Sequence, residues 1–361
     1  MNPELSRSYT GAAPRAALFE PHLLGAGLTL RNRSVLAPCT RNRALADLSP
    51  TPGAAAYYAA RAAAGLLITE AAVIAPHAQG YYNTPGIFLD SHVRAWAAVT
   101  DAVHRAGGLI FLQLWHTGRM AHSHWTGQQP QAPSAVLDPN QRRQSLGLLL
   151  HHELPRAMSQ HEVVQAIGEY RAAALRARVA GFDGVEIHGA NGYLPEQFLR
   201  QHTNRRSDAW GGTEANRAAF SLAVVDACGE AVGGERVGLR LSPAAYFSEM
   251  QWTAGDNETY LYLLGELGHR PLAYLHSGIV EDDVYDYLAC TSTQFLRRHW
   301  CGSLIGNGGY TPDAAACHIA AGAFDLIAFG KLFIANPDLV RKIGQERPLE
   351  PYSRDLLDLL T

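Results

Sequence analysis

Residues 159–189 read SQHEVVQAIGEYRAAALRARVAGFDGVEIHG, and this stretch indicates how the rest of the chain is built. Ser159 and Glu162 form the pattern of a helix N-cap with a capping box, so we predict a helix over Ser159–Ala180. The short apolar run Gly184–His188 follows this helix and ends in glycine and polar residues. An amphipathic helix joined to a short apolar run is the repeating unit of a parallel α/β fold.

The same alternation recurs along the whole chain, with further helices predicted over Ser91–Ala106 and Thr213–Ala231. Eight strands that are each followed by a helix close into a barrel more readily than into an open sheet. We therefore expect an α/β fold of the (β/α)8 TIM-barrel type, with residues 1–361 as a single domain. The eight predicted strands are Val35–Pro38, Gly65–Glu70, Leu109–Leu114, Gly184–His188, Val237–Leu241, Leu272–His276, Ser303–Gly306 and Leu326–Gly330.

Two segments lie outside this repeat. Gly25–Arg33 is predicted to form an N-terminal hairpin that caps the floor of the barrel. His116–Met158 is predicted to be a long irregular loop after the third strand, and loops of this length in compact domains usually form lids or walls of functional sites.

The composition and charge of the chain indicate that its binding partners are small molecules. A net charge of −3, with 17% charged residues, provides no basic field for a nucleic acid or an anionic membrane. The N-terminus lacks the pattern of a signal peptide, and no apolar run approaches the roughly 20 residues of a membrane span. We expect a cytoplasmic monomer or homodimer.

The chain carries no pattern typical of a metal site or a disulfide framework. The cysteine count is 5, an odd number, and no two of them are spaced as a metal-binding pair. His116, His122 and His124 lie close in sequence but lack the spacing of ligands on a helix. We therefore assign no metal.

The residues that follow the predicted strands are unusually polar, and in (β/α)8 barrels function gathers at these C-terminal strand ends. Arg240 is costly to bury unpaired, so an anionic or polarised group should face it. Alternatively, Gln113 and Arg240 pair with each other or with Glu186. The candidates in strand order are Pro38, Thr40, Glu70, Ala71, Gln113, Trp115, His188, Asn191, Tyr193, Arg240, His276, Asn307, Gly308, Gly309, Gly330 and Lys331.

Two loops among these candidates have backbones suited to a site. The run Gly306–Gly309 precedes a predicted helix at Thr311 and can present backbone N–H groups to a phosphate, together with Gly330–Lys331. The loop HGANGY at 188–193 contains two glycines that permit tight turns, and it is either a site or a hydrogen-bonded scaffold. Cys39 precedes Thr40, and adjacent side chains on a strand point to opposite faces. We therefore predict that the Cys39 side chain forms part of the wall of the site and is not a nucleophile.

Several longer motifs occur in a fixed order: LAPCTRNR (36–43), QLWHTGR (113–119), APSA (132–135), GFDGVEIHGANGYL (181–194), GLRLSP (238–243) and IANPDL (334–339). Together they resemble the Old Yellow Enzyme family of FMN-dependent alkene reductases over about Leu18–Arg341. The resemblance implies FMN as cofactor and NADPH or NADH as hydride donor. It also implies ping-pong reduction of activated C=C bonds in enones, maleimides or nitroalkenes.

The resemblance further implies roles for individual residues toward FMN. Thr40 would contact the flavin near O4 and N5, Gln113 its pyrimidine edge and Arg240 its N1 and O2 atoms. The backbones of Pro38 and Ala71 would line the ring. The phosphate would be held by Asn307, Gly308, Gly309, Gly330 and Lys331.

On the substrate side, His188 and Asn191 would hold a carbonyl or nitro oxygen, and Tyr193 would supply the proton. Trp115 and His276 are the further residues expected to contact the substrate.

Two departures from the family pattern bear on these expectations. Lys331 stands where the family usually has arginine, which predicts weaker FMN retention. The family's aromatic C-terminal motif is not evident in Pro348–Thr361, so that wall of the pocket is missing, reshaped or supplied by a neighbouring chain. These departures leave open an alternative function, a barrel that binds FMN or another phosphorylated ligand without turnover.

Overall fold

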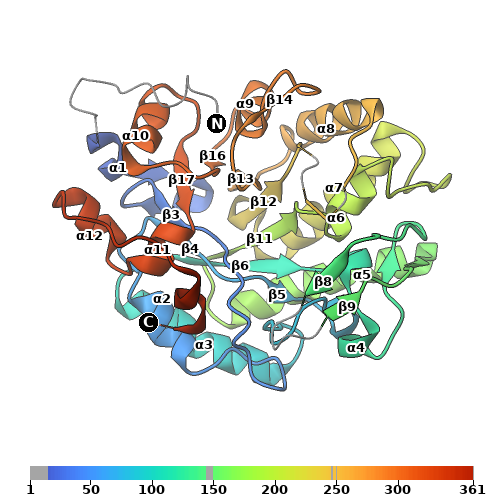
Figure 1. Ribbon diagram of the computed structural model, residues 1–361, viewed down its shortest axis with the longest axis horizontal. Coiled ribbons are helices and arrows are strands. Elements are labelled where there is room, and N and C mark those ends of the chain that lie inside the picture. Colours follow the sequence, from blue (N-terminus) through green and yellow to red (C-terminus); the bar gives the residue numbers. More distant parts are fainter. Residues whose placement is uncertain (1–14, 144–148, 245–246, 249, 361) are drawn as a thin grey trace.

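The computed structural model, which describes residues 15–143, 149–244, 247–248 and 250–360, contains a closed ring of eight parallel strands (Figure 1). Each strand pairs with the next one along the chain, and the last pairs with the first. The predicted (β/α)8 TIM barrel is therefore confirmed. The eight strands are β3 (Ser34–Leu36), β4 (Leu66–Ile68), β6 (Ile110–Trp115), β11 (Gly184–Gly189), β12 (Val237–Leu241), β13 (Tyr274–Ser277), β16 (Leu304–Gly306) and β17 (Leu326–Phe329).

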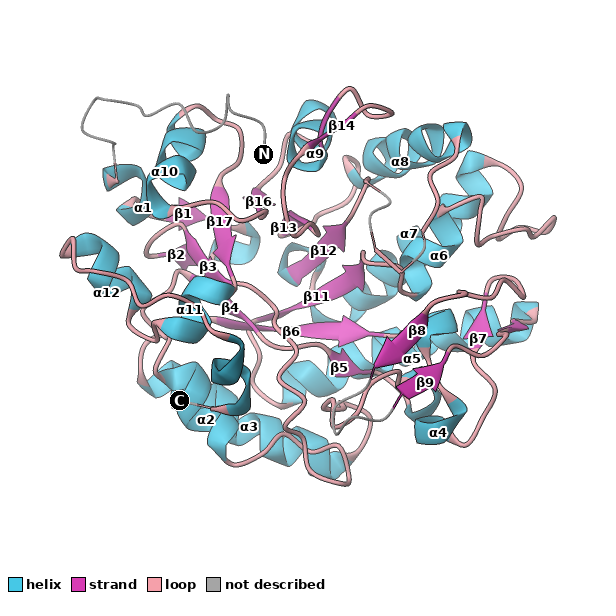
Figure 2. Cartoon of the chain, viewed as in Figure 1, coloured by secondary structure: helices cyan, strands magenta, loops and turns pink. Residues whose placement is uncertain are grey.

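Helices surround the strands, as Figure 2 shows, and at least one follows each strand of the ring. A large apolar cluster fills the space between the ring and these helices. No helix in the described ranges is both long enough and apolar enough to cross a bilayer. The outer helices are α2 (Gly53–Ala59), α3 (Asp90–Arg105), α5 (Gln160–Val179), α7 (Glu214–Val232), α8 (Ala254–Leu267), α9 (Ser292–His299), α10 (Pro312–Ala320), α11 (Lys331–Ala335) and α12 (Leu339–Gly344).

The predicted capping box at the start of α5 is present. The Glu162 backbone N–H donates to Ser159 Oγ at 3.3 Å, and the Ser159 N–H donates to Glu162 Oε2 at 2.8 Å. These bonds satisfy two N–H groups that the helix itself leaves without partners. The helix then packs Val163, Ala166 and Tyr170 into the buried cluster, which explains its apolar stripe.

Several strands end earlier than predicted. The predicted strand over 35–38 is β3 at 34–36, and the one over 65–70 is β4 at 66–68. Pro38 and Glu70 therefore follow their strands, because the ladder stops where neighbouring strands diverge toward their helices. This leaves the polar residues on short loops at the rim.

An apolar cluster that we call the floor plugs the N-terminal end of the barrel. It joins Leu24 and Leu30 to inward-facing strand residues such as Val35, Leu66 and Ile305. Gly184 and Gly238 make room for large rings inside the barrel. A Cβ at Gly184 would lie 2.4 Å from the Phe111 ring, and one at Gly238 would lie 2.3 Å from the Tyr274 ring.

The hairpin that carries Leu24 and Leu30 is real, but its predicted bounds were wrong. Its strands are β1 (His22–Leu23) and β2 (Thr29–Leu30), joined by a 3-10 turn at Gly25–Gly27. The predicted range began in this turn and omitted β1, because two-residue strands are too short to show an alternating pattern.

The segment 116–158 is more regular than predicted. It contains two short helical turns, η3 (Gly118–Met120) and α4 (Ser123–Thr126). β7 (Gln131–Ala132) pairs with β10 (Arg156–Ala157), and β8 (Gln141–Arg143) pairs with β9 (Leu149–His151). The prediction of an irregular loop was wrong here, because such short strands form by tertiary pairing rather than by local periodicity.

Candidate active site

The end of the barrel opposite the floor is lined by buried polar side chains, which we call the polar end. Strand register places Glu186 beside Gln113, and His188 beside Arg240, which in turn lies beside His276. The relative exposure of these five residues ranges from 0% for Glu186 and His276 to 8% for Arg240. The structure thus brings together four of the predicted site residues and adds Glu186.

Gln113 does pair with Glu186, as one alternative from the sequence proposed. Gln113 Nε2 donates to Glu186 Oε1 at 2.6 Å. The other carboxylate oxygen, Oε2, lies 2.8 Å from His276 Nδ1. This pairing leaves the Gln113 carbonyl oxygen available to a ligand, so it does not exclude the cofactor role.

Three buried nitrogen atoms of these five residues have no hydrogen-bond partner within the described residues. They are Arg240 Nε, His188 Nδ1 and His276 Nε2. Burial, together with the positive charge of Arg240 and the nearby His276, holds the pKa of His188 well below its usual value. His188 is therefore a neutral imidazole at pH 7. Buried polar atoms of this kind need a partner that the described residues do not supply, such as a ligand or an ordered water.

The loop after β11 has a special backbone that aims its side chains. Asn191 has a left-handed backbone with φ of 60°, and Gly192 follows with φ of 79°. A Cβ on Gly192 would lie 2.5 Å from Ser248 Cβ, so only glycine fits. The Asn191 N–H donates to Ser242 Oγ at 3.0 Å, which ties the loop to the end of β12.

A buried charge network that the sequence prediction missed supports this loop from below. Glu196 Oε2 accepts the Gly192 N–H at 2.7 Å, and Glu196 Oε1 accepts from Arg200 at 2.8 Å. Arg200 is fully buried and also donates to the backbone oxygen of Ser242 at 2.6 Å. Its Nη1 lies 3.5 Å from Asp256 on α8. The sequence signal was a Glu and an Arg four residues apart in the otherwise apolar helix α6 (Leu194–Leu199) and its end.

Aromatic rings form one wall beside His188. Tyr193 packs edge-on against Trp115 and His188, with ring centroids 4.9 Å and 4.7 Å apart. Tyr81 stacks on Trp115 at 5.2 Å, and its hydroxyl lies 3.0 Å from the Tyr193 hydroxyl. Tyr81 was not among the predicted site residues, because it follows the short strand β5 (Ala72–Val73) rather than a barrel strand.

The loop after β3 brings Pro38 and Thr40 to the same end of the barrel. Cys39 lies against Gly330, where an added Cβ would be 3.1 Å from the Cys39 sulfur. This contact places the Pro38–Thr40 loop next to Gly330–Lys331. Thr40 is exposed and Ala71 is buried.

Glu70 anchors this loop from beneath. Its carboxylate accepts the Arg41 backbone N–H at 2.9 Å, and its own N–H donates to the Tyr58 hydroxyl at 2.8 Å. Burial outweighs the effect of Arg41 and raises the pKa of Glu70 to about 7.

The C-terminal segment, whose family motif is absent, returns to this same loop. The Arg41 guanidinium donates to the backbone oxygens of Leu356 and Leu359, and Arg43 donates to that of Leu357. These carbonyls lie in and just after η6 (Arg354–Asp358). The tail of the same chain therefore braces the loop that carries Thr40.

The two predicted phosphate loops lie side by side, because β16 pairs with β17. Gly308 and Gly309 both have positive φ, 132° and 78°, and Lys331 is exposed at the start of α11. A Cβ on Gly308 would lie 2.6 Å from Asp282 Cβ. The Asp282 carboxylate is itself satisfied, since it accepts from the Tyr310 hydroxyl at 2.8 Å and the Thr293 N–H at 3.1 Å.

The histidines in the loop after β6 take part in the hydrogen bonds of the loop itself. His122 accepts the His124 N–H at 3.1 Å, and its other ring nitrogen lies 3.0 Å from the His151 backbone oxygen. No group of side chains suited to a metal ion occurs in the described part of the chain.

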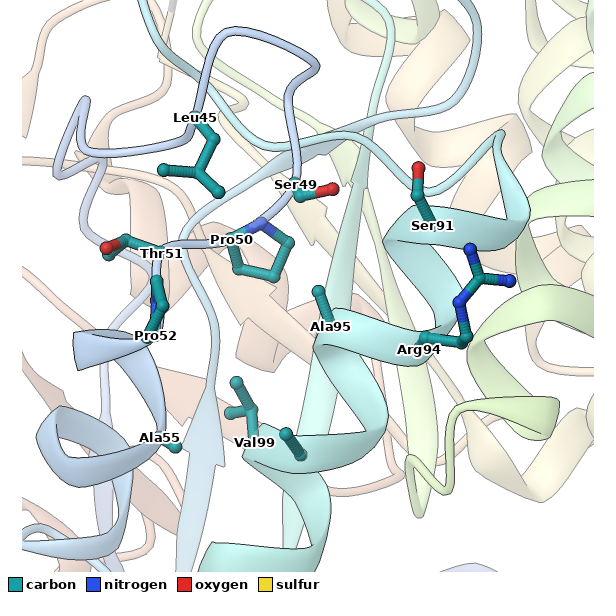
Figure 3. Close-up of a pocket in the computed structure, with 11 residues that line it drawn as sticks. Leu45, Ser49, Pro50, Thr51, Pro52, Ala55, Ser91, Arg94, Ala95 and Val99 are labelled. Atoms are coloured by element: carbon teal, nitrogen blue, oxygen red, sulfur yellow. The ribbon is translucent and has the colours of Figure 1, made fainter.

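A groove of about 430 Å³ lies away from these residues, on the outer surface between α2 and α3 (Figure 3). Leu45, Pro52, Ala95 and Val99 line it, with Arg94 at α3. None of the predicted site residues contributes to this groove.

The fold and the polar end define a class of protein, a (β/α)8 barrel with a glycine-rich rim at β16 and β17 and a buried arginine inside. Comparison with known proteins identifies that class as flavin oxidoreductases. A profile of the NADH:flavin oxidoreductase / NADH oxidase family matches residues 17–350. The chain belongs to this family. Its cofactor is FMN and its electron donor is a nicotinamide.

Individual relatives agree with this assignment. The chain is 40% identical over 350 residues to 12-oxophytodienoate reductase 1 of Oryza sativa subsp. japonica, covering 95% of this chain and 90% of the relative. Its structure is similar to the Old Yellow Enzyme homologue of Zymomonas mobilis, with a TM-score of 0.89, 37% identity and coverage of 94% and 96%. Morphinone reductase in complex with tetrahydroNAD gives a TM-score of 0.87 at 41% identity, with coverage of 94% and 93%.

The described residues fit FMN. Arg240 Nε has no partner within the described residues, so it and the carbonyl side of the Gln113 amide could bond to the polar edge of a flavin ring, and the glycine backbones at 308–309 suit a phosphate. His276 has no exposed surface and its Nδ1 is engaged by Glu186, so its contact with the substrate stays a prediction.

Proposed function

We propose that this protein is an ene-reductase that uses NADPH or NADH to reduce C=C bonds conjugated to a carbonyl or nitro group. One arrangement supports the proposal most directly. The neutral imidazole of His188 lies beside the rings of Trp115 and Tyr193, and the charged Arg240 is its neighbour on β12. The relatives support the proposal, since two of them are reductases named after compounds that carry a ketone group, 12-oxophytodienoate and morphinone.

When bound, FMN supplies hydride chemistry at its N5 atom, and the protein positions it. Thr40, Gln113, Arg240 and the backbones of Pro38 and Ala71 would hold the ring. Asn307, Gly308, Gly309, Gly330 and Lys331 would hold the phosphate. The fixed charge of Arg240 would stabilise negative charge at the ring edge that it faces.

On the substrate, His188 and Asn191 would donate hydrogen bonds to the carbonyl or nitro oxygen. Such donors stabilise the charge that develops on this oxygen, which makes the β-carbon electron-poor. Tyr193 would deliver the proton to the α-carbon from the opposite face, and Trp115 would form the side of the pocket. Because nicotinamide and alkene would use the same space in turn, the kinetics should be ping-pong.

The test is an anaerobic spectrum of the purified protein, recorded before and after NADPH or NADH and again after 2-cyclohexenone or N-ethylmaleimide. We expect the flavin band to bleach with the nicotinamide and to return with the alkene. A band that bleaches but does not return would favour a flavin barrel without alkene turnover and would overturn the proposal.

A further inference from the structure

Glu186 is a carboxylate in the centre of the polar end. It is the third residue of β11 and points into the barrel, where it meets side chains from β6 and β13. It has no exposed surface, and each of its two oxygens contacts a side chain from another strand. None of the roles proposed above uses it, although it touches two of the predicted site residues.

The Glu186 carboxylate keeps its charge in this setting. Burial alone raises the pKa of such a group, but His276, Arg240 and the Gln113 amide together outweigh burial and hold the pKa of Glu186 below its usual value. Burial and Arg240 meanwhile lower the pKa of His276 despite its contact with Glu186. The cluster therefore contains one negative charge on Glu186, one positive charge on Arg240 and a neutral His276.

The charge of Glu186 decides the orientation of the Gln113 amide. An ionised carboxylate only accepts hydrogen bonds, so the amide must turn its NH2 group toward Glu186 Oε1, 2.6 Å away. The carbonyl oxygen of Gln113 is then presented as an acceptor on the other side. A donor on the pyrimidine edge of a flavin would find this acceptor already in place.

The same charge acts on the ring of His276. Its Nδ1 carries the hydrogen because it faces Glu186 Oε2 at 2.8 Å, which makes Nε2 an acceptor. His276 Nε2 has no hydrogen-bond partner within the described residues, and Arg240 is its neighbour in register. Glu186 thus sets the donor and acceptor pattern on both sides of Arg240.

We propose that Glu186 is a positioning residue for the flavin: it orients Gln113 and His276, and its negative charge offsets that of Arg240, which lowers the reduction potential of bound FMN. The proposal rests on the proposed placement of Gln113 and Arg240 at the flavin. It does not depend on which alkene is reduced.

The test is a spectroelectrochemical titration of the FMN-loaded protein and its Glu186→Gln variant. Glutamine keeps the size of the side chain, removes the charge and replaces one acceptor oxygen with an NH2 donor. Without this charge the reduced, more negative form of FMN should be favoured about tenfold over the oxidised form, a shift of about 30 mV to more positive potential for a two-electron couple. The affinity for oxidised FMN, measured by fluorescence quenching, should fall as the Gln113 amide loses its fixed orientation.

The matched control is Glu230→Gln, which also removes one negative charge, but from an exposed side chain on α7 outside the polar end. We expect its potential to stay within a third of the Glu186→Gln shift from wild type. A potential for Glu186→Gln equal to wild type, or an equal shift in both variants, would overturn the proposal. Because the electrode and mediators exchange electrons with the flavin in place of the nicotinamide and the alkene, the result is independent of whether the alkene is reduced.

A second measurement uses the unmodified protein, in case Glu186→Gln does not fold. Redox-difference infrared spectra with 13C-labelled glutamate should show a carboxylate band that moves when the flavin is reduced. No moving carboxylate band would contradict the proposal.

Discussion

The two ends of one barrel differ in what their side chains leave unsatisfied. The floor is an apolar plug in which Leu24 and Leu30 meet inward-facing strand residues. At the polar end, the same strands carry Gln113, Glu186 and Arg240 in buried positions, with nitrogen atoms that lack partners within the described residues. The comparison indicates that the floor stabilises the fold, whereas the buried polar groups at the other end destabilise it unless a ligand supplies their missing partners.

The largest expected effect is on catalysis at the polar end. Tyr193→Phe should lower the rate at which the alkene reoxidises the flavin by about 100-fold or more, because the proton donor is lost. Flavin reduction by the nicotinamide should be unchanged, and the free energy of unfolding should fall by no more than about 1 kcal/mol, because the hydroxyl contact with Tyr81 is lost. Stopped-flow measurement of both half-reactions tests this, with Tyr262→Phe on the exposed side of α8 as the control. Normal reoxidation in Tyr193→Phe would remove the donor role.

Substitutions in the floor should have the opposite effect, with lower stability and unchanged catalysis. Leu30 is fully buried, so Leu30→Ala should lower the free energy of unfolding by about 3 kcal/mol while leaving both half-reactions intact. Leu23 belongs to the same hairpin but is 66% exposed, and Leu23→Ala should cost less than about 0.5 kcal/mol. Urea unfolding of the two variants compares them directly. Equal losses would show that the hairpin does not seal the floor.

The ionisation of Glu70 should change the free energy of unfolding, because this carboxyl group is buried at the polar end. Its pKa is about 7 in the folded protein against an ordinary 4.5, so the folded state binds the proton more tightly. The stability that this proton confers is complete below about pH 4.5 and is lost as the pH rises through 7. Glu70→Gln should therefore be more stable than wild type at pH 8, by on the order of 2–3 kcal/mol.

Urea unfolding of the FMN-saturated protein between pH 5 and 8 measures this difference. Glu162 is the control, because its pKa is lowered to about 2 by Arg156 and its charge does not change in that range. A wild type and a Glu70→Gln variant that differ equally at pH 5 and pH 8 would contradict the assignment.

Substitutions of Lys331 test whether the rim of the polar end holds the FMN phosphate. Lys331→Ala should speed FMN release on dilution about tenfold, the value of one hydrogen bond to a charged phosphate. Lys331→Arg should retain FMN more tightly than wild type, because a guanidinium binds a phosphate through two bonds. Release is followed by the rise in free flavin fluorescence. Unaltered release in both variants would place the phosphate elsewhere.

The smallest effect is expected from the Tyr81 hydroxyl, which lies 3.0 Å from that of Tyr193. Tyr81→Phe removes one hydrogen bond of about 1 kcal/mol, so alkene reduction should slow about fivefold. Stopped-flow reoxidation by the alkene measures this, and a rate equal to wild type would show that the Tyr81 hydroxyl does not assist Tyr193.

Much of this molecule could be predicted from local patterns. The capping box at Ser159 and Glu162 defined the start of a helix, and eight apolar runs alternating with helical segments predicted the closed barrel. Polar residues after these runs pointed to His188 and Arg240, because the ends of parallel strands converge in a barrel. The hairpin bounds and the short strands of 116–158 could not be predicted in this way, since strands of two or three residues are too short to show periodicity.

The sequence by itself determined the barrel, the family and the end of the barrel that carries the site, because each depends on local repeats and motifs. Only the tertiary structure decided that Glu186 joins Gln113 to His276, that Tyr81 meets Tyr193, and that the C-terminal carbonyls brace Arg41. These partners lie 73, 90, 112 and 315 residues apart. Closing the ring brings them together, and no periodic pattern along the chain specifies which side chains then meet across its interior.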